Sequence, residues 1–300
     1  MRRLISLAIT IALVTVIGAR HASSSASAVA NPWPHTAVSG FSDPYGQSFY
    51  VAFADGSVEK STQAKAHGDA SGIALARPMV GGAISVDGKG YWLVASDGGL
   101  FSYGSARFFG SMGATRLNQP VFSMAATATG KGYWLVARDG GIFTFGDAHF
   151  YGSTGAIRLA QPIAGITTGS GGKGYRMVAR DGGIFSFGTA PYFGSLPSIG
   201  LRVNDVVGMA PTPTNKGYWI AERNGHVHAF GDARSFGNYA PRPEFSCDHP
   251  VGIFSNPQEQ GYRLVLESGG TISFGALIDY LDPSGTAYLC NPLNPGPGHL

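Results

Sequence analysis

The chain has 300 residues, of which 44% are hydrophobic and 13% are charged, and 45 are glycines. This hydrophobic content excludes a disordered chain, and the glycine content is typical of a protein made of sheets and turns. Residues 1–30 hold three arginines and no acid, so the rest of the chain carries no net charge and lacks the basic surface that nucleic-acid binding requires.

Residues 1–30 have the three parts of a secretory signal peptide. Arg2 and Arg3 precede an apolar stretch at 4–17, and a Ser/Ala-rich region ends in Ala28-Val29-Ala30. The apolar stretch is too short for a comfortable membrane span. We therefore expect cleavage near Asn31, a secreted or cell-wall-associated protein, and no membrane span after cleavage.

Six apolar runs, each opened by an aromatic residue, recur along the rest of the chain. The steps between them are 42, 42, 42, 43 and 44 residues. Self-similarity at this period is typical of repeat architectures. The runs begin at Phe49, Tyr91, Tyr133, Tyr175, Tyr218 and Tyr262.

Residues 120–161 show one repeat most clearly. Four β-prone runs, at 120–125, 132–137, 142–145 and 147–151, lie between clusters of Gly, Asp and Thr. Asp139-Gly140 separates the second run from the third and is a strong hairpin signal. Each repeat is therefore predicted to be four short strands.

The second run of each repeat shows no alternation of apolar and polar residues, so both of its faces should be buried. Four-stranded units of about this length, buried on both sides, are typical of β-propeller blades. The prediction is an all-β, six-bladed β-propeller of four-stranded blades at 31–290, followed by a flexible tail at 291–300. A seven-bladed ring is the alternative.

The chain contains two cysteines, Cys247 and Cys290. Disulfides persist in exported proteins, and this one would close a loop of about 44 residues, which the chain-entropy model values at roughly 4 kcal/mol less any strain. The bond would clamp the C-terminus. The pattern shows no strand shared between the end blades, so packing of blade one against blade six must close the ring.

Residues 132–153 are similar to a repeat of secreted actinobacterial proteins, with the consensus Gly-Tyr-Trp-Leu-Val-Ala-x-Asp-Gly-Gly-Ile-Phe-x-Phe-Gly-Asp-Ala-x-Phe-x-Gly-Ser. The resemblance covers residues 36–280 and extends more distantly to chromosome-condensation-regulator repeats. It implies export and a propeller-like fold. In that family the repeats stand alone or accompany cell-wall hydrolase or esterase domains, and the resemblance brings no catalytic residue.

Two residues depart from the consensus. Arg176 and Arg263 occupy positions where other copies have Trp92, Trp134 and Trp219. We expect blades four and six to present a different surface there.

Several side chains could carry chemistry. The repeated turn aspartates offer one carboxylate each, whereas Ca²⁺ needs six to eight oxygens, so we expect a turn role for them. His226 and His228 alternate on one strand face, but the sequence shows no third ligand, so we expect no metal and no cofactor. Ser57 and Lys60 have the spacing of a catalytic pair but follow a hairpin turn, which argues against that role. The aspartates are Asp55, Asp97, Asp139 and Asp181.

The first strand of each repeat is expected to line a central channel. These strands hold almost no acid and no histidine, whereas glycosidases need paired carboxylates and metal-dependent lactonases need several oxygen ligands. This composition argues against an enzyme. The predicted lining residues, or their neighbours, are Val38, Gly81, Ser123, Gly165, Gly208 and Gly252.

Two sets of repeated cations are the candidate ligand-binding residues. One set lies in the turn before the second strand, and the other lies in the hairpin turn that should occupy the opposite rim. Such rings can hold a polyanion or a glycan, although turns also favour polar residues for their own sake. The sets are Lys89, Lys131, Lys173 and Lys216, and Arg138, Arg180 and Arg223.

The sequence therefore predicts an exported, monomeric, non-enzymatic binding or scaffold module at the cell envelope. The expected partner is a cell-wall polysaccharide or a surface protein, and no nucleic acid. The alternative is a secreted hydrolase that uses loop residues such as Asp43, His226 and His228. Loss of an activity on Asp43→Ala or His228→Ala would favour that alternative.

Overall fold

The structure is a computed structural model, and it describes residues 31–240, 247–256, 258 and 261–275. The predicted signal peptide at 1–30, the tail at 291–300 and Cys290 lie outside these residues. The leader, the tail and the Cys247–Cys290 disulfide therefore stay predictions.

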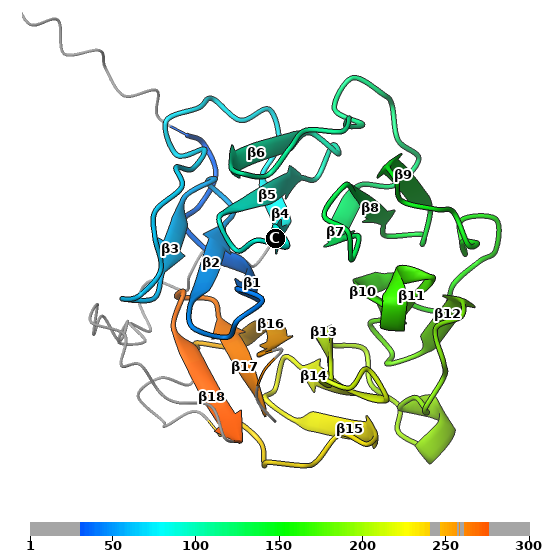
Figure 1. The fold of residues 1–300 in the computed structure, drawn as a ribbon. Coiled ribbons are helices and arrows are strands. Elements are labelled where there is room, and N and C mark those ends of the chain that lie inside the picture. Colours follow the sequence, from blue (N-terminus) through cyan, green and yellow to red (C-terminus); the bar gives the residue numbers. More distant parts are fainter. Residues whose placement is uncertain (1–30, 241–246, 257, 259–260, 276–300) are drawn as a thin grey trace, which may run out of the picture.

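The described residues form six antiparallel sheets of three strands each, arranged in a ring (Figure 1). In every sheet the first strand lies innermost, the second is central and the third is outermost. Two short 3-10 turns, η1 (Ser170–Gly172) and η2 (Pro197–Ile199), are the helical elements of the described residues. The sheets are β1 (Ala37–Ser42), β2 (Phe49–Phe53) and β3 (Val58–Lys60); β4 (Met79–Ile84), β5 (Gly90–Ala95) and β6 (Leu100–Gly104); β7 (Val121–Ala126), β8 (Gly132–Ala137) and β9 (Ile142–Gly146); β10 (Ile163–Thr168), β11 (Gly174–Ala179) and β12 (Ile184–Gly188); β13 (Val206–Pro211), β14 (Gly217–Glu222) and β15 (Val227–Gly231); and β16 (Pro250–Ser255), β17 (Gly261–Leu266) and β18 (Thr271–Gly275).

The hydrophobic core lies between the blades. Trp134 and Val136 of β8 face Tyr175 and Met177 of β11, and the rings of Trp134 and Tyr175 lie 5.7 Å apart. Every residue of β8 and β11 is buried. The prediction that the central strands are buried on both faces is confirmed, and it explains why their sequence does not alternate.

A tyrosine hydroxyl joins each of blades two to six to the blade before it, whereas blade one has Phe49 at this position. Tyr133 donates to the carbonyl of Gly110 at 2.7 Å, and Tyr262 donates to that of Gly237 at 2.8 Å. The same bond links Tyr91 to Gly68, Tyr175 to Gly152 and Tyr218 to Gly194. The one-residue and two-residue insertions in the later repeats leave it intact.

A second link between blades is a backbone hydrogen bond near the axis. The amide of Val121 donates to the carbonyl of Ser96 at 2.9 Å, and the amide of Ile163 donates to that of Arg138 at 2.8 Å. These bonds join the first strand of a blade to the end of the central strand before it.

The equivalent bond closes the ring between blade six and blade one. The amide of Ala37 donates to the carbonyl of Glu267 at 3.0 Å. Phe49 and Val51 pack against Val265 across the same junction. The six-bladed ring and its closure by packing are thus confirmed, and the seven-bladed alternative is wrong because blade six lies directly against blade one.

The prediction of a fourth strand is wrong for blades one to five, which have three strands each, and the segment predicted for blade six at 277–280 lies outside the described residues. After β9 the chain turns at Gly146, where φ is 66°, and leaves the edge of the sheet. Residues 147–151 then run outside the ladder. The indole of Trp134 donates to the carbonyl of His149 at 2.7 Å, and the amide of Tyr151 donates to the Tyr175 hydroxyl at 3.2 Å. Side chains therefore bind a segment whose aromatic composition is typical of a strand.

The expected surface difference at Arg176 and Arg263 is also wrong. Both side chains are buried between blades, with 0% and 5% exposure. The Nε of Arg176 donates to the Pro191 carbonyl at 2.7 Å, as a tryptophan indole does in other blades, and the guanidinium lies 5.5 Å from the centre of the Tyr218 ring. Arg176 fills the tryptophan position because it offers the same donor and a cation for the next aromatic ring.

We predict that Tyr175→Phe lowers the free energy of unfolding by about 1–2 kcal/mol, because it leaves the Gly152 carbonyl and the Tyr151 amide without their partner. Urea denaturation measures the change. Tyr45→Phe is the control, because the Tyr45 side chain is 62% exposed. Equal stability of Tyr175→Phe and the wild type would contradict the inter-blade role.

Candidate functional site: the central channel and its two rims

The six innermost strands line a central cavity of about 140 Å³. In each blade the pairing between first and central strands shifts by one residue, and the unpaired residue faces this channel. Such a bulge redirects a side chain toward the axis. The unpaired residues are Val38, Val80, Phe122, Ala164, Val207 and Val251.

The lining of the channel is made of small and apolar residues, with the hydroxyls of Ser39 and Ser123 as its polar side chains. The predicted lining residues are confirmed except for Gly81, whose neighbours Val80 and Gly82 line the cavity instead. Among the described lining residues there is no acid, histidine, lysine or arginine. This lining supplies neither a general acid nor a metal ligand.

The arginine set lies at the rim where the central strands end. Arg138 directly follows β8, is half-buried, and places its guanidinium 4.2 Å from the centre of the Phe122 ring in the channel wall. Burial lowers the pKa of Arg138, and the like charge of Arg180 lowers it further. Two guanidinium groups of neighbouring blades therefore repel each other at one mouth of the channel.

Arg223 differs from these two arginines. Its Nη2 lies 2.6 Å from a carboxylate oxygen of Glu267, the residue at the same position in blade six. Neither Arg138 nor Arg180 has a carboxylate within ion-pair distance in the described part of the chain. The unpaired positive charge of this rim is concentrated on blades three and four.

The lysine set lies at the opposite rim, where the central strands begin. All four lysine side chains are exposed, and an aspartate lies on the same rim in three of the four blades, as Asp87, Asp147 and Asp232. Asp87 accepts hydrogen bonds from Ser85 at 2.6 Å and Ser105 at 2.7 Å, and Asp147 accepts one from Thr127 at 2.9 Å. These aspartates offset the lysine charge in three blades, so the lysines are weaker candidates for holding an anion.

The repeated turn aspartates close their own hairpins. In each of them one carboxylate oxygen accepts the amide two residues later at 2.9 Å. The structure thus gives these residues the turn geometry that the sequence predicts. Asp43 lies in another turn, where it accepts the amides of Tyr45 and Gln47 at 2.7 and 3.2 Å.

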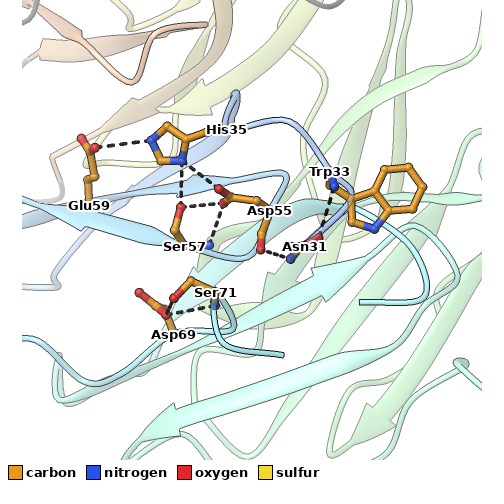
Figure 2. Close-up of polar contacts among 8 residues, drawn as sticks. All are labelled: Asn31, Trp33, His35, Asp55, Ser57, Glu59, Asp69 and Ser71. Atoms are coloured by element: carbon orange, nitrogen blue, oxygen red, sulfur yellow. Dashed lines mark hydrogen bonds and ion pairs between the residues drawn. The ribbon is translucent and has the colours of Figure 1, made fainter. Parts of the chain in front are cut away.

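Ser57 belongs to a polar cluster on blade one, shown in Figure 2. The Nδ1 of His35 lies 2.9 Å from Asp55 and 3.1 Å from the Ser57 hydroxyl, which also donates to Asp55 at 2.6 Å. A catalytic triad needs serine and aspartate on different nitrogens of the histidine, so this cluster lacks that geometry. Burial favours the neutral form of Asp55, but hydrogen bonds from Ser57 outweigh it and lower the pKa of Asp55.

The same cluster attaches the N-terminal segment to the ring. Asn31 donates to the carbonyl of Asp55, and the indole of Trp33 donates to the carbonyl of Leu75 at 3.2 Å. The ring of His35 stacks on Phe53 with a centroid distance of 4.0 Å. These contacts indicate a structural role for the cluster.

Glu222 is a candidate functional residue that the sequence pattern does not predict. It lies across the hairpin from the two histidines, with a carboxylate oxygen 2.6 Å from the Nε2 of His228. One ligand atom from each of Glu222, His226 and His228 lies within 4.8 Å of the others. The expectation that the histidines lack a third ligand is therefore wrong. The hairpin could have indicated this third ligand, because Glu222 ends β14 and lies opposite His226, which directly precedes β15.

No protein-family model matches the sequence, and no curated protein matches it. Among solved structures, the β-propeller domain of Cps50 (Swd1) from Myceliophteria thermophila is similar, with a TM-score of 0.52 and 11% identity over 81% of this chain and 97% of that one. The fold is a β-propeller. Likeness at this identity concerns the fold alone. Among the described residues, no helix is long and apolar enough to span a membrane.

We predict a pH dependence at the lysine rim. Hydrogen bonds, first from the Ser85 hydroxyl, lower the pKa of Asp87 from 3.8 to about 2. The folded pKa lies below the unfolded one, so the stabilisation is present above pH 4 and disappears as the pH falls through 2. Asp87→Asn should therefore lower stability at neutral pH by less than about 1 kcal/mol, because the carboxylate is exposed and screened.

NMR titration of the Asp87 carboxyl, combined with urea unfolding at neutral and acid pH, measures both effects. Titration near 3.8, or a stability difference that persists unchanged in acid, would contradict the role of these hydrogen bonds.

Proposed function

We propose that this chain is an exported, non-enzymatic β-propeller that binds an anionic polysaccharide of the cell wall through the rim formed by Arg138, Arg180 and Arg223. The observation that carries the proposal is the pair of like-charged guanidinium groups on neighbouring blades, half-buried beside the channel mouth and without a carboxylate partner in the described residues.

An anion relieves the repulsion between these groups. Arginine stays protonated in proteins, so the lowered pKa of Arg138 reflects a cost of charge and not a neutral side chain. A carboxylate or phosphate bound between Arg138 and Arg180 would accept charge-assisted hydrogen bonds from both. Neighbouring blades repeat the spacing, which suits a polymer with repeated anionic groups.

The residues of the hydrolase alternative do not form one site. Asp43 follows β1 at the lysine rim, whereas His226 lies in the β14–β15 hairpin at the arginine rim. The acid-free lining of the described channel also favours a binding role over an enzymatic one. These two observations support a module that binds without cleaving its ligand.

The predicted signal peptide and the resemblance to secreted actinobacterial repeats support export. An exported chain meets wall polymers directly, and it lies in a compartment where a Cys247–Cys290 disulfide would persist. We propose that this bond clamps the C-terminus and that the protein acts as a monomer.

Binding to purified, protease-treated cell walls tests the proposal. A double variant that carries Arg138→Gln and Arg180→Gln should bind the walls roughly 100-fold more weakly, because two charge-assisted contacts are lost. The matched control is a double variant that carries Lys131→Gln and Lys173→Gln, because it removes the same charge from the opposite rim. The control should leave affinity within about 3-fold of wild type, apart from general screening effects.

Equal losses in the two double variants would contradict the assigned rim. Binding to untreated walls that is absent with the protease-treated walls would assign a surface protein as the partner and overturn the polysaccharide. Release of soluble sugar from the walls would overturn the non-enzymatic role.

A further inference from the structure

Blade five departs from its neighbours at three positions that lie together on one hairpin. Glu222 pairs with Val206 as Ala179 pairs with Ile163 in blade four, so a carboxylate replaces a methyl group. His228 pairs with Ile220 as Phe185 pairs with Met177. The carbonyl of His226 accepts the Glu222 amide as that of Gly183 accepts the Ala179 amide.

The three replacements face the same side of the sheet. His226 and His228 are two residues apart on one strand, and Glu222 lies opposite His226 across the turn, so all three side chains share a face. Blade four has small or apolar residues at these three positions, whereas blade five has two imidazoles and a carboxylate that lie close together. Turn chemistry does not explain the change, because the turn itself is closed by Asn224, whose side chain accepts the His226 amide at 2.9 Å.

The Glu222 carboxylate is buried within the protein itself. The Glu222 side chain is 4% exposed and that of His228 is 21% exposed, whereas His226 is exposed. Burial of a carboxylate is costly unless the group is paired or binds a metal. His228 meets one oxygen at 2.6 Å, and the Asn224 amide approaches the other at 3.4 Å.

We propose that Glu222, His226 and His228 form a binding site for Zn²⁺ or a similar divalent transition-metal ion. Two imidazole nitrogens and one carboxylate oxygen are a donor set that such ions favour. Bonds of about 2.0–2.1 Å in a tetrahedral site place ligand atoms about 3.4 Å apart. The three ligand atoms, which lie within 4.8 Å of one another, reach this arrangement by side-chain rotation.

The site leaves its fourth position open. His226 is exposed, so water or an anionic group of a ligand completes the coordination from solvent. Asn224 serves as the outer partner that orients the carboxylate. The site lies on the same rim as Arg180 and Arg223, because Arg223 directly follows Glu222.

Titration of untagged, chelator-treated protein with ZnCl₂ by calorimetry tests the proposal. The expected result is one Zn²⁺ per chain, with affinity weakened by more than about 100-fold in His226→Gly and in His228→Phe, since loss of a ligand should exceed the loss of an outer partner. Each variant restores the residue type of blade four, which should preserve folding. Glu222→Gln keeps the size of the side chain and gives a third variant.

His149→Ala is the control, because this exposed histidine of blade three lies outside the cluster. It should bind Zn²⁺ as the wild type does. Co²⁺ should give tetrahedral absorption bands with wild type and control, and lose them in the three variants. Zn²⁺ should also raise the melting temperature of the wild type but not of the variants.

Absence of saturable Zn²⁺ binding by the wild type would overturn the proposal. Binding that is equal in the wild type and in the three variants would also overturn it, because it would place the ion elsewhere. None of the three readouts uses the polysaccharide, so the metal site and the proposed function fail or succeed separately.

Discussion

The hydrogen bond from a tyrosine hydroxyl to a glycine carbonyl of the preceding blade holds five of the six blade junctions, and the rest of this ring depends on it. Tyr175 reaches across a blade interface to Gly152, whose backbone has a φ of 130°. A Cβ at Gly152 would lie 2.5 Å from Phe187 of the next blade. The glycine is therefore required both for its conformation and for the close approach of the two blades.

This contact also explains why the outer segment is not a strand in a blade such as blade three. The segment between the third strand and the next blade has hydrogen-bond partners in the indole of its own blade and the hydroxyl of the next. A ladder with the third strand would compete with both contacts. The blades gain a connection to their neighbours at the expense of a fourth strand. The ring itself closes with the same backbone hydrogen bond that joins internal blades, and with the apolar contact of Phe49 in place of a tyrosine bond.

The sequence was sufficient for the parts of the fold that depend on packing. The spacing from Tyr133 to Tyr175 and the unbroken apolar run at 132–137 predict the ring, because they encode interfaces buried on both sides. The outer segment at 147–151 was mispredicted because composition does not reveal whether a backbone group bonds to a strand or to a distant side chain. Arg176 was misplaced for a related reason, since its role depends on Pro191 and on the next blade's Tyr218.

The candidate sites were predicted less completely than the fold. The repeat pattern identified Arg138 and Arg180, but only their spatial arrangement separates them from the ion-paired Arg223. Glu222 was not predicted because it ends an apolar strand, and the sequence alone does not show that it lies beside His226 and His228. Rims of propellers can vary in this way because the interfaces beneath them carry the stability, and function is accordingly found on the turns.

Hydrogen exchange at the Ala37 amide tests the closed ring most directly. This amide donates to Glu267 across the junction of blades one and six, as the amides of Val121 and Ile163 donate across internal junctions. The Ala37 amide should be protected within about 10-fold of those two amides, because all three open by separation of adjacent blades. An Ala37 amide that exchanges at the rate of an unstructured residue, while Val121 and Ile163 stay protected, would contradict it.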